Sequence, residues 1–86
     1  MIVPYNRKER HMPLVQIGGV GDYLTLDQKQ ELIRRVTDAV VAVEGEGLHG
    51  VTWVTIADIQ PGAWGVGGTP VTADDLRAMA AAPTSA

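Results

Sequence analysis

The order of apolar and polar residues predicts two strands. Residues 13–17 carry mostly apolar side chains behind a leading proline, which is tolerated at the first position of a strand. Three glycines follow closely, at positions 18, 19 and 21, and predict that this short strand breaks there. Residues 51–59 are rich in β-branched and aromatic residues and form the clearest strand pattern of the chain.

A helix is predicted between the two strands. Thr25 and Gln28 have the spacing of a capping box, in which each side chain satisfies the other residue's backbone N–H. Apolar residues then recur at three-to-four spacing on one face: Leu32, Ile33, Val36, Ala39, Val40 and Val43. Gly45 and Gly47 end the helix at about residue 43 or 44. Strand, helix and strand in this order predict a β-α-β unit with parallel strands.

The C-terminal part predicts smaller elements. Pro61 and Gly62 turn the chain, and the glycine-rich residues 64–68 indicate a tight hairpin or an edge loop. Thr72 caps a short second helix that runs to about residue 81. We therefore expect an α/β (α+β) fold divided into a leader or mis-annotated start at 1–12, a β-α-β domain at 13–72, and a short helix with a frayed tail at 73–86.

Composition indicates that this unit does not stand alone. The chain has 86 residues, is 45% hydrophobic and contains no cysteine. A single domain of this size buries only about 60% of its unfolded surface, and disulfides are not available to staple it. Two strands and one helix also leave strand edges open. We expect self-association, with the edges in an interface, and neither a cofactor nor a metal.

Charge limits the classes of partner. The net charge is −3, with +2 from three basic and one acidic residue in 1–11 and −5 from four basic and nine acidic residues thereafter. This balance does not suit a nucleic-acid binder. No apolar run approaches the roughly 20 residues of a membrane span, and residues 1–11 lack the apolar core of a signal peptide. The expected location is cytoplasmic.

Residues 13 to about 72 resemble the 4-oxalocrotonate tautomerase family. The resemblance rests on four segments in the family's order and spacing: MPLVQI (12–17), LTLDQKQELI (24–33), VTWVTIADI (51–59) and WGVGG (64–68). It implies a β-α-β fold assembled as a hexamer (a trimer of dimers), with a trimer or dimer as alternatives. It also implies keto–enol tautomerisation by an amino-terminal proline, here Pro13, acting as general acid/base.

The chemistry depends on where the mature chain begins. If it begins at Pro13, the nitrogen is a secondary amine, and burial lowers an amino-terminal pKa from about 8 toward neutrality, which suits proton transfer. If it begins at Met1, the nitrogen is an amide without basicity. The alternative reading of Pro13 is a strand-initiating proline. A catalytically silent oligomer that retains the leader is therefore the first rival function.

The resemblance also implies substrate-binding positions, and two of them depart from the family. The family's arginines before the helix and on the second strand correspond to Leu24 (or Tyr23, since the loop is one residue longer) and Trp53. Without this arginine pair, bidentate carboxylate recognition is lost. Trp64 takes the place of an aromatic pocket wall, with core or interface filler as its alternative. For Trp53, which alternates with its neighbours on a strand, burial in an interface is favoured over substrate contact. A smaller or more aromatic enol, such as that of phenylpyruvate, is favoured over 2-hydroxymuconate.

Other candidates are weaker. The glycines at 18, 19 and 21 do not complete a phosphate-binding pattern, because Leu24 holds the third position. His49 is interpreted as a solvated loop histidine. Asp58, at a strand end, is interpreted as a turn cap. It is also the only, weak, candidate to activate water in the second rival function, a hydratase or dehalogenase of small unsaturated acids. Arg77 is interpreted as part of a solvated helix face.

Overall fold

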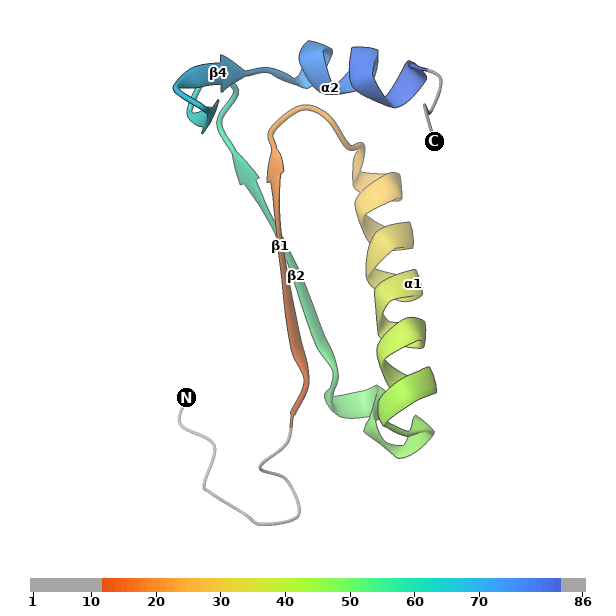
Figure 1. The fold of residues 1–86 in the computed structure, drawn as a ribbon. Coiled ribbons are helices and arrows are strands. Elements are labelled where there is room, and N and C mark those ends of the chain that lie inside the picture. Colours follow the sequence, from red (N-terminus) through yellow and green to blue (C-terminus); the bar gives the residue numbers. More distant parts are fainter. Residues whose placement is uncertain (1–11, 83–86) are drawn as a thin grey trace.

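A computed structural model describes residues 12–82 of the chain, so the predictions for 1–11 and for the tail at 83–86 lie outside the described residues. Figure 1 shows a long helix running beside a pair of strands, with a hairpin and a second helix at one end of that pair. The elements are β1 (Leu14–Val20), α1 (Leu26–Glu44), the 3-10 helix η1 (Glu46–Val51), β2 (Trp53–Ile59), β3 (Trp64–Val66), β4 (Thr69–Val71) and α2 (Ala73–Ala81).

The strands β1 and β2 pair in parallel, as predicted, from Leu14 opposite Trp53 to Val20 opposite Ile59. The predicted break after residue 17 is wrong, because β1 continues through Gly18 and Gly19 to Val20. Glycine disfavours a strand through its entropy and its missing side chain. Here both glycines pair with β2 residues, and the backbone ladder needs no side chain to form.

Helix α1 begins and ends where its sequence predicts. The Thr25 hydroxyl accepts a hydrogen bond from the Gln28 N–H at 3.1 Å, and the Thr25 N–H donates to Gln28 Oε1 at 2.9 Å. Gly45 closes the helix at φ 127°, a conformation that side chains rarely adopt. Instead of an irregular loop, residues 46–51 form η1, and this delays the start of β2 from the predicted residue 51 to Trp53.

The described core is small. Alternate residues of β1 and β2, including Ile17 and Ile56, are half-buried on the face that α1 covers (Figure 1). The buried core of the described chain consists of four small apolar residues: Val20, Val41, Val71 and Ala73. On the opposite face, which we call the open face, Leu14 and Trp53 remain 54% and 57% exposed. No helix of the described chain covers this face (Figure 1).

The C-terminal elements confirm the predicted hairpin and second helix. Strands β3 and β4 pair antiparallel, and the turn between them places Gly67 and Gly68 at φ 58° and 84°, as a two-residue hairpin requires. Thr72 caps α2 through a second capping box with Asp75. Helix α2 then crosses the end of the molecule where β1 and β2 finish (Figure 1). No helix of the described residues is long and apolar enough to cross a membrane.

Candidate active site

Pro13 lies directly before β1 and is buried. Its carbonyl accepts a hydrogen bond of 2.8 Å from the Trp53 N–H, the first backbone contact between the strands. The pyrrolidine ring fixes φ, so the residue is held both by its own covalent geometry and by β2. Its position at the head of the strand is the one the sequence predicts.

Trp53 is the predicted substrate-binding residue that the fold brings beside Pro13. It is the first residue of β2 and pairs with Leu14. Its side chain stands on the open face, 57% exposed, which is unusual for a large aromatic residue in a monomer. Together with the exposed Leu14, it forms an apolar surface next to Pro13.

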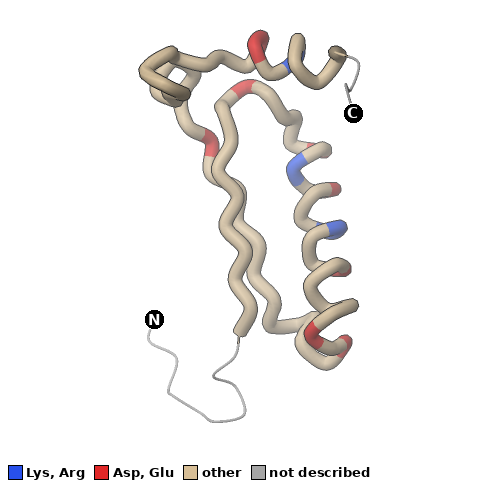
Figure 2. The backbone as a smooth tube through the Cα atoms, in the orientation of Figure 1, with Lys and Arg blue, Asp and Glu red and all other residues tan. Residues whose placement is uncertain are grey.

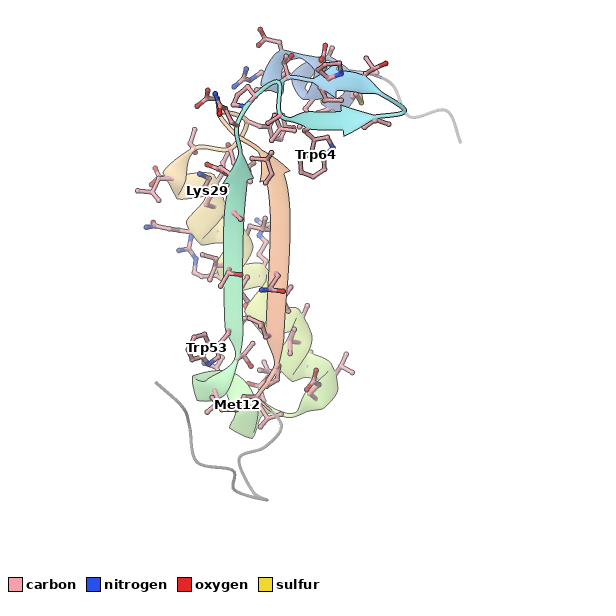
Figure 3. All side chains as sticks on the ribbon, turned by 90° about the vertical axis from the view of Figure 1, so that its left-hand side faces the viewer. Met12, Lys29, Trp53 and Trp64 are labelled. Atoms are coloured by element: carbon pink, nitrogen blue, oxygen red, sulfur yellow. The ribbon has the colours of Figure 1, made fainter. Side chains whose placement is uncertain are left out.

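Trp64 lies at the other end of the sheet. Figure 3 shows Met12 and Trp53 near one end and Trp64 near the opposite end. A β-carbon built on Gly18 would be 3.9 Å from Cζ3 of Trp64, so the half-buried indole ring lies over the open face beside Gly18. At about 3.3 Å per residue, the five residues from Pro13 to Gly18 span roughly 16 Å. One chain therefore does not place Trp64 against Pro13.

Leu24 lies in the loop between β1 and α1, at the same end as Trp64. It is half-buried and lines a shallow groove along α1 together with Gln28, Glu31, Leu32 and Arg35. Pro13 does not line this groove. The four predicted site residues thus fall into two pairs: Pro13 with Trp53 where β1 and β2 begin, and Leu24 with Trp64 where these strands end.

The basic residues of the described chain lie on the helices. Figure 2 shows that the paired strands are free of Lys and Arg, and that the basic positions of the described chain lie on α1 and α2. These are Lys29, Arg34, Arg35 and Arg77. Within the described chain, the end of the sheet that holds Pro13 therefore has no basic residue, and the acidic positions at that end lie on α1 and η1 (Figure 2). The described residues also contain no cluster of three or more His, Asp or Glu side chains that could hold a metal ion.

Asp58 has a different role from the turn cap expected of it. Its carboxylate forms an ion pair of 2.5 Å with Nζ of Lys29 on α1. This pair ties the end of β2 to the first turns of α1, at the end of the sheet away from Pro13 (Figure 3). One oxygen of this carboxylate is thus already engaged by the Lys29 ammonium group. His49, expected in a loop, lies instead in η1, where it is exposed.

Glu31 is a carboxylate whose pKa is set by two neighbouring arginines. It accepts a hydrogen bond from Nε of Arg35 at 3.2 Å and pairs with Nη2 of Arg34 at 3.5 Å. The hydrogen bond from Arg35 and the positive charges of both arginines lower the pKa of Glu31. The carboxylate is exposed and four residues from Arg35 on α1, so this shift reflects local pairing on a helix surface.

Arg77 makes a long-range contact that the sequence did not predict. Its Nη1 donates to Oδ1 of Asp74 at 2.8 Å, and its Nη2 donates to the carbonyl oxygen of Asp22 at 2.5 Å. The first contact follows from i, i+3 spacing on α2 and was accessible to sequence analysis. The second joins residues 55 positions apart and has no sequence signal.

Known proteins resemble this chain over the same region. Residues 13–74 match the family model described as "Tautomerase enzyme". The protein named "Probable tautomerase K2" of Dickeya dadantii (strain 3937) is 38% identical over 61 residues, which cover 71% of this chain and 90% of that protein. The match to the family begins at Pro13, the residue that the sequence motif singles out.

Solved structures show the same fold. A 4-oxalocrotonate tautomerase isozyme of Methylibium petroleiphilum superposes with a TM-score of 0.61 at 33% identity, covering 74% of this chain and 97% of its own. A candidate 4-oxalocrotonate tautomerase of methicillin-resistant Staphylococcus aureus superposes with a TM-score of 0.61 at 29% identity, covering 69% of this chain and 92% of its own.

Proposed function

This chain belongs to the tautomerase enzyme family, and from that premise we propose that it interconverts the enol and keto forms of a small 2-keto acid through Pro13. The observation that carries the proposal is the place of Pro13, buried at the head of β1 with its carbonyl held by the Trp53 N–H. Tautomerisation needs a base that also returns the proton. An amine with a pKa near neutrality does both.

The mechanism requires the amine of Pro13 to be free. When the mature chain begins at Pro13, the ring nitrogen is a secondary amine, and an apolar pocket wall formed by Trp53 and by a neighbour's Leu24 and Trp64 would lower its pKa from about 8 by desolvating its charged form. The neutral amine removes a proton from the enol oxygen or from carbon. The resulting ammonium delivers that proton to the other end of the same conjugated system. No cofactor enters this step.

The pocket in this proposal is shared between two copies of the chain. Pro13 and Trp64 are separated by roughly 16 Å of strand within one chain, so a pocket containing both needs a second copy. Leu24 and Trp64 lie at the same end of the unit and would form a wall against the Pro13 and Trp53 of a neighbour. The exposed apolar open face, with Leu14 and Trp53, supports this self-association. A hexamer built as a trimer of dimers is the expected assembly, with a trimer or dimer as alternatives.

The proposed substrate is aromatic and carries few charges. The end of the sheet that holds Pro13 has no basic residue in the described chain, whereas Trp53 offers a ring. A dicarboxylate such as 2-hydroxymuconate would leave its charges poorly paired in such a site. The enol of phenylpyruvate places a ring and a single carboxylate in the pocket and is the substrate to test first.

The test compares the protein with its Pro13→Ala variant. Ketonisation of the enol of phenylpyruvate is followed by the loss of the enol's ultraviolet absorbance, after the mature amino terminus has been established by intact mass. Alanine keeps a primary amine at the mature amino terminus but removes the secondary amine and the ring that fixes its nitrogen, so kcat/KM should fall, by up to about 100-fold. Pro70→Ala makes the same substitution at an exposed proline of β4 and serves as the control. Activity in Pro13→Ala equal to that of the control would exclude the mechanism.

The rival functions give different results in the same experiment. A purified chain that retains residues 1–12 has an amide at Pro13, shows no ketonisation and is then a silent oligomer of the family. Turnover of halo-acrylates without enol ketonisation would indicate a hydratase or dehalogenase. The ion pair of Asp58 with Lys29 speaks against that reaction, since Asp58 is its only candidate base.

A further inference from the structure

The loop between β1 and α1 is tied down at both of its ends. At one end, the Gly21 N–H donates to the Ile59 carbonyl at 2.6 Å and joins the loop to the last residue of β2. At the other end, the capping box of Thr25 and Gln28 fixes the entry into α1. Between these ties lie three residues, 22–24, of which Leu24 belongs to the proposed substrate wall.

The middle of this loop depends on a contact from α2. Asp22 has φ 69°, and among the described residues no other non-glycine residue has a positive φ. This conformation costs free energy for a residue with a side chain. Its carbonyl accepts a hydrogen bond from Nη2 of Arg77. A guanidinium bound to a carbonyl makes a charge-assisted bond, stronger than one between neutral groups. This hydrogen bond joins residues 22–24 to α2.

Arg77 is itself held in place. Its Nη1 binds Asp74 one turn earlier on α2, which orients the guanidinium plane toward the loop. The helix has its own capping box at Thr72, and its first residue, Ala73, is buried. The contact therefore comes from a formed helix rather than from a loose tail.

Helix α2 lies largely beyond the residues that match the family model. The family match ends at residue 74, whereas α2 runs to Ala81. The solved relatives cover 74% and 69% of this chain while using 97% and 92% of their own lengths, so both are shorter than this chain. The restraint from Arg77 thus comes from beyond the residues that the family model matches.

We propose that Arg77 is a positioning residue that holds the β1–α1 loop, and with it Leu24, in the conformation that binds substrate. The inference rests on the proposed function, since Leu24 acts on substrate only if the wall described above exists. Arg77 touches neither Pro13 nor, in the proposal, the substrate. Its loss should therefore weaken binding and leave the proton-transfer step unchanged.

The test uses Arg77→Ala, Arg77→Lys and the control Arg34→Ala in the protein with its mature amino terminus. Arg34 is an exposed arginine of α1 that pairs with Glu31, so its removal makes the same change in charge without touching the loop. Losing the Asp22 hydrogen bond should raise KM for the enol of phenylpyruvate by about threefold to tenfold. For Arg77→Ala, kcat should stay within about twofold of the starting protein. Arg77→Lys keeps a charged hydrogen-bond donor, so its KM should fall between those of the starting protein and Arg77→Ala.

A second readout does not depend on activity. Amide hydrogen exchange at residues 22–24 should be faster in Arg77→Ala than in the starting protein, while exchange within α1 and β2 stays the same. Arg34→Ala should leave the loop unchanged. Equal loop exchange in Arg77→Ala and the starting protein overturns the proposal. A fall in kcat that matches the rise in KM, or a loss of assembly, also overturns it, because either indicates a general structural role.

The failure of this inference is distinguishable from that of the proposed function. If the starting protein does not ketonise the enol, the proposed function fails, and so does the claim that Arg77 serves substrate binding. The exchange measurement then still decides whether Arg77 holds the loop. If the starting protein is active and Arg77→Ala has the same KM, only the positioning role is lost.

Discussion

Replacing Gly21 with alanine tests how closely the β1–α1 loop is packed against the end of β2. A β-carbon at this position would lie 3.0 Å from the Ile59 carbonyl oxygen and 3.3 Å from Cδ of Pro61. The same Gly21 donates its N–H to that carbonyl at 2.6 Å. The new methyl group therefore meets backbone that cannot rotate away, and the loop has to shift by a few tenths of an ångström.

The size of the effect follows from a matched pair of substitutions. Overpacking of this kind costs typically about 1 to 3 kcal/mol. Alanine also restricts the unfolded chain more than glycine does, which stabilises the fold by about 0.4 to 1 kcal/mol. Gly19, in β1, has nothing within 4 Å of the place that an added methyl group would take, so Gly19→Ala should show only the second effect. The entropy gain is common to both variants, and their difference in unfolding free energy should be about 1 to 3 kcal/mol.

The measurement is urea unfolding of Gly21→Ala and Gly19→Ala, followed by far-ultraviolet circular dichroism. Both variants are compared at the same protein concentration, because any assembly makes apparent stability depend on it. The midpoint of Gly21→Ala should be the lower, with similar slopes for the two variants. Unfolding free energies within about 0.5 kcal/mol of each other would refute the steric argument, since differences of that size are ordinary for uncrowded surface positions.

Two further outcomes are expected from α1. Val41 is 3% exposed and Val43 is 88% exposed, so Val41→Ala should lower the unfolding free energy by about 1 to 3 kcal/mol, whereas Val43→Ala should change it by about 0.5 kcal/mol or less in urea unfolding. The pKa of Glu31 is lowered in the fold, so its contribution to stability is present above its ordinary value of 4.5 and is lost as pH falls through the lower folded value. An NMR titration should show a pKa below 4.5 for the Glu31 carboxyl, and this pKa should return toward 4.5 in Arg35→Ala. An unchanged pKa in that variant would contradict the assigned cause.

Local signals account for the elements that sequence analysis predicted well. The bounds of α1 follow from Thr25, Gln28 and Gly45, three residues whose preferences act within one helical turn. The β3–β4 hairpin follows from Gly67 and Gly68, which adopt positive φ without steric cost. In each case the residues that specify the structure are neighbours along the chain. Their identity is enough to predict the result.

The features that the sequence did not predict depend on residues far apart along the chain. Gly18 and Gly19 extend β1 because β2, about forty residues later, supplies their backbone partners. Asp58 meets Lys29 only because the β-α-β crossover lays α1 along β2. A charged side chain at a strand end has several local uses, and its sequence neighbours do not indicate which distant partner the fold provides.

In the candidate site, too, local features were predicted from the sequence and the arrangement in space was not. The motif around Pro13 and the glycine-rich turn after Trp64 identified the family, and the predicted site residues came from an alignment to it, because a strand head and a glycine-rich turn are local features. Their separation into two pairs at opposite ends of the sheet is a property of the folded unit. It follows from the length of β1 and from the hairpin's place beyond the end of β2.

By itself, the sequence determined the order of the elements, their caps and the membership of the tautomerase family, since each depends on residue types at short spacing. Only the tertiary structure decided that α2 reaches back to the β1–α1 loop, where Arg77 binds the Asp22 carbonyl. That contact requires a side chain and a backbone group 55 residues apart to meet at hydrogen-bond distance. Hydrogen bonds act over about 3 Å, so a pair distant in sequence is specified by the packing of the elements between them.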